Sequence, residues 1–249
     1  MRKIETAILV TLVFAVLAVP GCGSQEEVCV GDAAHYVLVP MTSRSDIETT
    51  KEVTPAIADE VAERVADSCG EVSSGIGNNR PITDLVLTDT DSKPRYETAV
   101  DRTPVVDDLR DDIREELNDD LLAPLAEAES TPGSPTLTTL AAIARQAEAF
   151  SWGKVTIVLP HDGLMVERSP QTGTQVVLGQ DEVPQSVLDE WLPSLKPLRG
   201  DCLMVLAAGA ESRIDDDAIL RAQDALGATM ERAGIGFVAT RSGELPAGC

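Results

Sequence analysis

The sequence predicts an α/β fold, in which a doubly wound, mostly parallel central sheet has one antiparallel edge strand and helices on both faces. Residues 36–39, 154–159 and 202–207 form short, mostly apolar runs, which is the pattern of strands buried on both faces of a parallel sheet. Helical patterns separate these runs, as the crossover between two parallel strands requires. Polar residues follow the first two runs, and ligands of such sheets bind just beyond the carboxyl ends of the strands.

Residues 1–21 are predicted to form an export signal and not part of the fold. Two basic residues precede an apolar run at 8–19, which has the length of a signal peptide rather than of a membrane span. The run ends in Pro20-Gly21-Cys22, which resembles the lipobox of bacterial lipoproteins. The resemblance implies that Cys22 is diacylated and becomes the mature N-terminus, although Pro20 departs from the family pattern. An uncleaved anchor and ordinary cleavage near Gly21 are the alternatives.

Each of these alternatives places the bulk of the chain outside the cytoplasm. Two acyl chains anchor a protein stably, whereas one chain gives only marginal membrane binding. We therefore expect a protein that is lipid-anchored at the cell membrane and faces outward. Residues 22–32 would form the linker, residues 33–241 a single domain, and residues 242–249 a C-terminal tail.

The chain is strongly acidic, with a formal net charge of −22 over 249 residues. An acidic surface argues against nucleic acid as a partner and against direct binding to an anionic bilayer. It favours solubility or a cationic partner.

Four cysteines remain beyond Cys22, and an even number in an oxidising compartment predicts two disulfides. Three pairings are possible. Cys29 precedes the first strand and Cys69 ends a helix that runs back antiparallel to it, so both are expected at the amino-terminal edge of the sheet. We favour Cys29 with Cys69, and Cys202 with Cys249. A zinc site is the alternative, but these cysteines lack its close spacing.

The first half of the chain is assigned from caps, apolar periodicity and turn residues. Thr54-Pro55 predicts the start of a helix that ends at Cys69. Residues 73–79 are rich in glycine and asparagine and predict a loop. Residues 82–88 and 95–100 are predicted to pair as a β-hairpin.

The second half alternates between helix and strand. Residues 105–129 predict a long acidic helical region that Pro124 interrupts or kinks. A second helix begins at Thr136, and residues 166–178 are expected to be irregular. The remaining predictions are a short helix at 184–192, a helix at 215–233 with Gly234 as its C-cap, and a last strand at 235–240.

The order of these elements and their polar turns resembles the von Willebrand factor type A (vWA) domain, a Rossmann-like fold, over roughly residues 33–241. Residues 157–163, Ile-Val-Leu-Pro-His-Asp-Gly, look like the strand of that family that ends in Ser-Asp-Gly. In the family, an aspartate and two serines of the first turn, a threonine of the middle loop and a later aspartate hold a divalent ion, usually magnesium. The resemblance implies these roles for the matching residues, which are Ser43, Ser45, Thr136 and Asp162.

Met41 stands where the first aspartate of that family should be. Magnesium requires hard oxygen ligands in a near-octahedral arrangement, and a thioether supplies none. We therefore expect no metal or other cofactor, apart from weak magnesium binding, unless Asp46 replaces the missing acid. The degenerate adhesion site would consist of Met41, Ser43, Ser45, Thr136, His161 and Asp162. The alternative for its hydroxyl groups is that they cap loops and helix starts.

These expectations favour an interaction module that binds another envelope or extracellular protein at the carboxyl edge of the sheet. A scaffold or assembly subunit without a discrete ligand site is one alternative. A hydrolase in which His161 acts as a base for Ser43 is another. We do not expect an enzyme, because the sequence has no Gly-x-Ser-x-Gly elbow and its cysteines are assigned to disulfides.

Overall fold

A computed structural model describes residues 34–40, 47–68, 70–75, 83–85, 99–128, 135–179, 182–206, 215–241 and 244–249. Its central sheet has six strands in the order β3-β2-β1-β4-β7-β8. Five strands are parallel, and β3 at one edge pairs antiparallel with β2. This confirms the predicted fold class. The strands are β1 (Ala34–Leu38), β2 (Glu71–Ser74), β3 (Thr83–Leu85), β4 (Lys154–Leu159), β7 (Cys202–Leu206) and β8 (Gly236–Thr240).

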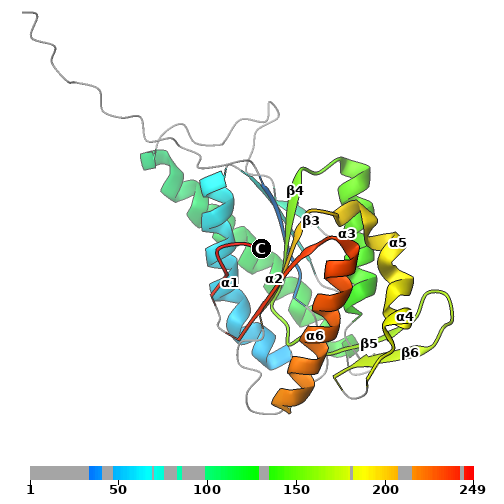
Figure 1. Cartoon of the computed structure of the whole chain (residues 1–249). Coiled ribbons are helices and arrows are strands. Elements are labelled where there is room, and N and C mark those ends of the chain that lie inside the picture. Colours follow the sequence, from blue (N-terminus) through cyan, green and yellow to red (C-terminus); the bar gives the residue numbers. More distant parts are fainter. Residues whose placement is uncertain are drawn as a thin grey trace, which may run out of the picture.

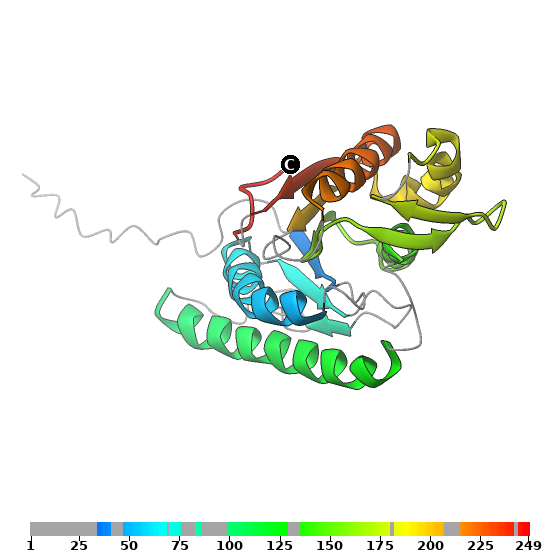
Figure 2. The ribbon, with the colours of Figure 1, turned by 90° about the horizontal axis from the view of Figure 1, so that it is seen from below.

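Helices cover both faces of this sheet (Figures 1 and 2). One face packs against α1 (Ile47–Ser68) and α2 (Ala99–Ala128). The other face carries α3 (Thr136–Phe150), α4 (Gln185–Leu188), α5 (Leu192–Leu195) and α6 (Asp216–Ala233), with the 3-10 helices η1 (Asp189–Trp191) and η2 (Lys196–Leu198). None of the helices in the described part of the chain has the length and apolar character that a membrane crossing needs.

Side chains of the central strands alternate between two cores. Val37 and Ile157 are fully buried on the face of α3 and α6. Leu38 and Val158, their neighbours in sequence, are fully buried on the face of α1 and α2. Because both faces are covered, these strands need apolar residues at every position. That requirement explains the mostly apolar runs in the sequence.

Residues 166–178 are not irregular, as the sequence suggested, but form most of a β-hairpin. Strands β5 (Met165–Arg168) and β6 (Gln175–Leu178) pair antiparallel as a separate two-stranded sheet. The turn closes with Ser169 N–H donating to Thr174 O at 2.8 Å, and Gly173 adopts a φ of +68°. The turn is rich in threonine and glycine, and each strand has only four residues. For these reasons the sequence did not predict the hairpin.

The helix predicted to begin at Thr54-Pro55 begins instead at Ile47, so Pro55 lies inside α1. A proline removes one intrahelical hydrogen bond. Burial of the stripe that contains Ile57, Val61 and Val65 keeps the helix in place, because most helical stability in proteins comes from packing of an apolar face. The local proline signal was therefore overridden.

The described residues do not form the hairpin predicted for 82–88 and 95–100, of which residues 86–98 lie outside the described part of the chain. Strand β3 pairs with β2, in the register Ser73 opposite Asp84. Ala99 and Val100 already belong to α2, and Ser73 and Ser74 lie in a strand and not in a loop. Helix α2 is also not interrupted at Pro124, and it continues to Ala128.

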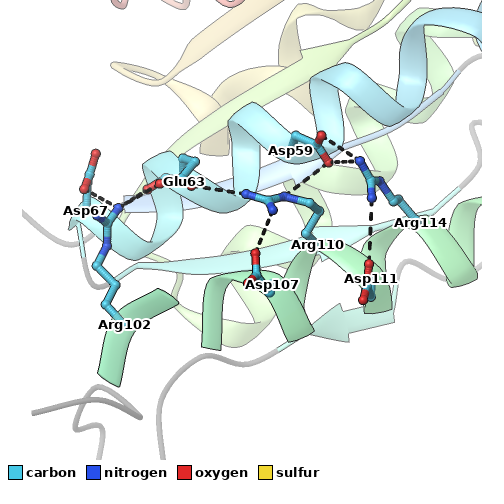
Figure 3. Close-up of polar contacts among 8 residues, drawn as sticks. All are labelled: Asp59, Glu63, Asp67, Arg102, Asp107, Arg110, Asp111 and Arg114. Atoms are coloured by element: carbon cyan, nitrogen blue, oxygen red, sulfur yellow. Dashed lines mark hydrogen bonds and ion pairs between the residues drawn. The ribbon is translucent and has the colours of Figure 1, made fainter. Parts of the chain in front are cut away.

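Helices α1 and α2 are joined by a row of ion pairs, which we call the arginine ladder (Figure 3). Arg110 of α2 lies at its centre, 3.3 Å from Asp59 and 3.2 Å from Glu63 of α1, and 2.7 Å from Asp107 of its own helix. The other members are Arg102, Arg114, Asp67 and Asp111. The ladder pairs acidic side chains of α1 with three of the few basic residues of this chain.

The C-terminal segment packs against α1 and is tied to the sheet by a disulfide. Arg64 of α1 donates to Leu245 O at 2.6 Å and to Pro246 O at 2.5 Å, and Glu60 accepts from Leu245 N–H at 2.9 Å. Cys249 forms a disulfide with Cys202 of β7, with a Cα–Cα distance of 5.7 Å.

This disulfide is the second of the two pairs that the sequence favoured. The other three cysteines, Cys22, Cys29 and Cys69, lie outside the described residues. Their lipidation and pairing stay predictions.

Candidate functional site

The candidate site lies at the carboxyl edge of the sheet, below the strands in the view of Figure 1. Strands β1 and β4 are parallel neighbours and end side by side, with Val39 N–H donating to Val158 O at 3.0 Å. Helix α3 precedes β4 and runs antiparallel to it, so Thr136 at the start of α3 lies at the same edge as His161 and Asp162. The structure thus places these three predicted residues at one edge. The other three, Met41, Ser43 and Ser45, lie outside the described residues.

Thr136 is the first residue of α3 and is buried, with 1% of its surface exposed. No residue that the structure describes hydrogen-bonds its Oγ1 atom. Pro135 precedes it and provides no side-chain cap for the helix. The hydroxyl is therefore not the helix cap that the alternative interpretation assigned to it.

Glu167 of β5 provides the cap instead. Its carboxylate accepts from the N–H groups of Leu137 and Thr138 and from the Thr138 hydroxyl, the last two at 2.8 and 2.6 Å. Burial raises the pKa of this carboxyl group, and the three hydrogen bonds oppose that rise. A carboxylate at this position also interacts favourably with the positive end of the helix dipole.

His161 and Asp162 form a buried turn after β4, each with 3% of its surface exposed. His161 Nδ1 accepts from Gly163 N–H at 2.9 Å. A nitrogen that accepts carries no proton, so the ring is neutral and its proton is on Nε2. Nε2 lies 3.4 Å from Asp162 Oδ1, which also accepts from Leu164 N–H at 2.8 Å. The imidazole therefore presents its Nε2 N–H group toward the carboxylate.

Helix α6 supports this turn from the other side. Gln223 is 7% exposed, and its side-chain amide donates to Asp162 O at 3.3 Å. Gly163 adopts a φ of +90°, and a Cβ there would lie 3.2 Å from Gln223 Cγ. This position therefore requires glycine.

Sequence reasoning missed both Glu167 and Gln223. Glu167 is two residues after Met165 in β5 and is buried on the same side of the strand. Its charge suggested an exposed position, and nothing in the local sequence indicated that it caps α3. Gln223 lies on the buried face of α6, and only its contact with the turn reveals its role.

The expectation of weak or absent magnesium binding stays a prediction, because Met41, Ser43 and Ser45 lie outside the described residues. Among the described residues no three His, Cys, Asp or Glu side chains come together in a way that could hold a metal. The resemblance assigns two carboxylates to this site, and Met41 occupies the position of one of them. The other is Asp162, whose Oδ1 accepts from Leu164 N–H and lies 3.4 Å from His161 Nε2. Magnesium binding typically uses carboxylate oxygens with retained waters in a near-octahedral arrangement.

A second constellation lies in strands β1 and β2. His35 Nε2 is 2.7 Å from Ser73 Oγ, and His35 Nδ1 is 3.4 Å from Glu71 Oε2. This order of groups is that of a Ser-His-acid triad. Ser73, however, has none of its surface exposed, so a substrate carbonyl has no access to its hydroxyl. We interpret these residues as a polar network within the sheet, in which His35 and Ser73 are buried and Glu71 is partly exposed.

Comparisons with known proteins assign no family. No family model and no curated protein match the sequence. Similar solved structures include the pilus adhesin SpaC from Lactobacillus rhamnosus GG in its open conformation, with a TM-score of 0.38 and 11% sequence identity. The match covers 86% of this chain and 28% of the adhesin chain. A similarity at this level carries no functional assignment, and the protein stands as an α/β protein with a mostly parallel sheet.

Proposed function

We propose that this protein is a vWA-like interaction module, anchored in the cell envelope and facing outward, that binds another envelope or extracellular protein at the carboxyl edge of its sheet. The sheet order, with β1 in the centre and the antiparallel β3 at the edge, supports this proposal because it agrees with the resemblance seen in the sequence. The observation that carries it is the position of Thr136 and Asp162. They come from α3 and from the turn after β4, and both lie at the edge where the resemblance requires them.

Partner binding at this edge is proposed to be independent of magnesium. The substitution of Met41 for an acid removes a ligand and a unit of negative charge. The neutral His161 ring, which offers a donor 3.4 Å from Asp162, supplies a partner for that carboxylate without an ion. A protein partner can hydrogen-bond hydroxyl groups directly, while a methionine side chain supplies an adaptable apolar contact.

Calorimetric titration with magnesium and manganese tests the metal part of this proposal. The wild-type protein should bind neither ion at micromolar concentration, whereas Met41→Asp should bind magnesium, because it restores a carboxylate ligand. Adding Asp162→Asn to Met41→Asp should remove that binding, and Glu115→Gln on the exposed face of α2 is the matched control. Micromolar binding by the wild type that disappears in Asp162→Asn would contradict the proposal.

Mild cross-linking of intact envelopes tests the interaction itself. Proteins that copurify with the wild type should be lost from Ser43→Arg, which places a bulky charge at the proposed contact, and retained by Glu115→Arg on another face. Equal recovery from both variants would place the contact elsewhere or show a scaffold without a discrete site.

Anchoring is tested separately at Cys22. Cys22→Ser should abolish incorporation of labelled palmitate and move the protein out of the membrane fraction, because acyl chains supply stable attachment. Cys249→Ser, which leaves the lipobox-like segment unchanged, is the control. Retention of Cys22→Ser in the membrane fraction would support the uncleaved-anchor alternative.

A further inference from the structure

An exposed aromatic residue marks the opposite, amino-terminal edge of the sheet. Phe150 is 65% exposed, and with Leu220 it is one of two large apolar side chains that the described residues leave exposed. It stacks on the partly buried Trp152, with ring centroids 6.3 Å apart, and Trp152 stacks on the buried His35 at 3.9 Å. Phe150 is therefore the outer member of an aromatic column that is fixed in the sheet, and not a loose surface side chain.

The described chain begins at the same edge. Ala34, the first residue of β1, pairs with Lys154, the first residue of β4. Phe150 and Trp152 immediately precede Lys154 in the sequence. Only about a dozen residues separate Cys22 from Ala34. A lipid on Cys22 would thus be attached close to Phe150 and Trp152.

Three exposed basic residues lie at this edge of an acidic chain. Lys154, Lys196 and Arg199 are exposed, and η2, which contains Lys196, packs against α3. The exposed or partly exposed acids of the same edge include Glu148, Glu71 and Glu231. Asp201 is partly buried and is occupied as an acceptor for Val155 N–H at 2.9 Å. Exposed basic groups beside exposed aromatic rings suit the headgroup region of a bilayer, where aromatic rings and cations are enriched.

We propose that the amino-terminal edge of the sheet rests on the membrane, with Phe150 and Trp152 at the level of the lipid headgroups. The inference depends on the lipid anchor of the proposed function. A segment of about a dozen residues spans at most roughly 40 Å even when fully extended, compared with a radius of gyration of about 17 Å for a domain of this size. Such a short tether raises the effective concentration of the nearest edge at the membrane. The carboxyl edge, with the candidate site, then faces away from the bilayer and toward a partner.

Quenching of tryptophan fluorescence by brominated lipid tests this orientation. The lipidated full-length protein is reconstituted on phosphatidylcholine vesicles with and without brominated acyl chains. Trp152 emission, obtained as wild type minus Trp152→Phe, should fall by roughly half for a ring about 5–10 Å into the interface. Trp191 is 2% exposed and remains in Trp152→Phe, where its emission should be unchanged. Trp191→Phe, with Trp152 as its single tryptophan, gives an independent measurement.

The control variants use the two exposed apolar residues. Phe150→Ser should reduce the quenching of Trp152 at least twofold, whereas Leu220→Ser, near the start of α6 at the opposite edge, should leave it unchanged. Lipidated, vesicle-bound protein with unquenched Trp152, or with quenched Trp191, would overturn this inference alone. Absence of lipid on Cys22 in mass spectrometry would overturn the proposed anchor and this inference together.

Discussion

Glu167 shows how one residue supplies what the local sequence lacks. Helix α3 begins after Pro135, which offers no side-chain acceptor, and the first N–H groups of a helix need partners from outside it. The carboxylate of Glu167 reaches them from β5, 30 residues from Leu137. The hairpin and the start of α3, where Thr136 lies, are thereby held in one arrangement.

The raised pKa of Glu167 predicts a pH dependence of stability. Burial raises the folded-state pKa above its ordinary value of 4.5, so the folded protein holds this proton more tightly than the unfolded chain does. The stabilisation contributed by protonated Glu167 is therefore complete below the pKa that this group has in the unfolded chain. It is lost as pH rises through the pKa that the group has in the folded protein. The unfolding free energy of wild type minus that of Glu167→Gln, which does not titrate, should be larger at pH 4 than at pH 7 in urea titrations.

The control for this experiment is Glu148→Gln, at an exposed position of α3. The unfolding free energy of Glu148→Gln should stay within about 0.5 kcal/mol of the wild-type value, and the difference should not follow the pH dependence of Glu167→Gln. A difference between wild type and Glu167→Gln that grows from pH 4 to pH 7 would show that the hydrogen bonds outweigh the effect of burial.

At the scale of elements, the arginine ladder joins α1 to α2 on one face of the sheet. Leu109, Ile113 and Leu117 of α2 form a buried stripe, each with 4% or less of its surface exposed. The ladder lies beside this stripe and adds directional contacts, which select one register between the helices. Single exposed ion pairs contribute little, but a network of several charges contributes more.

Arg110→Ala should lower the unfolding free energy by about 0.5–1.5 kcal/mol, because it removes ion pairs with Asp59, Glu63 and Asp107. The loss should shrink at 1 M NaCl, where the Debye length is about 3 Å. Arg145→Ala on the exposed side of α3 is the matched control. Urea unfolding at two salt concentrations checks both statements, and a loss that is independent of salt would point to packing of the Arg110 side chain rather than to its charge.

At the scale of the whole molecule, the C-terminal segment joins helix α1 to strand β7. Leu245 is 5% exposed and joins the core of α1 and α2, while Cys249 is bonded to β7. The clamp formed by Glu60 and Arg64 holds the backbone between them. The last residues are therefore part of the fold.

Cys249→Ser should lower the unfolding free energy by roughly 2–4 kcal/mol, because the disulfide closes a loop between residues 47 apart and so restricts the unfolded chain. Thermal and urea unfolding without reductant provide the measurement. In excess reductant the wild type should fall to the stability of Cys249→Ser. A difference that persists in reductant would assign the effect to the serine side chain and not to the bond.

Local signals predicted much of the fold. The runs at 154–159 and 202–207 became β4 and β7, of which β7 is described to Leu206. Helix α6 has Asp215 as its N-cap, accepting from Asp217 N–H at 3.2 Å, and Gly234 as its C-cap with a φ of +76°. These elements were predictable because their caps and apolar periodicity act within a few residues.

The location of the candidate site was also predictable in part. Because parallel strands end at a common edge, the sequence was enough to bring Thr136, His161 and Asp162 together. Their burial was not predictable, and neither were the contacts with Glu167 and Gln223. Those contacts join residues about 30 to 60 positions apart, and no periodicity or cap records such a pairing.

The sequence by itself therefore determined the fold class, the buried strands and the edge at which polar residues gather, since apolar periodicity dictates which faces are buried. Only the tertiary structure decided that Pro55 lies inside a helix, that β3 pairs with β2, and that residues 165–178 form a hairpin. In each case the local preference was weak, and burial against distant residues outweighed it.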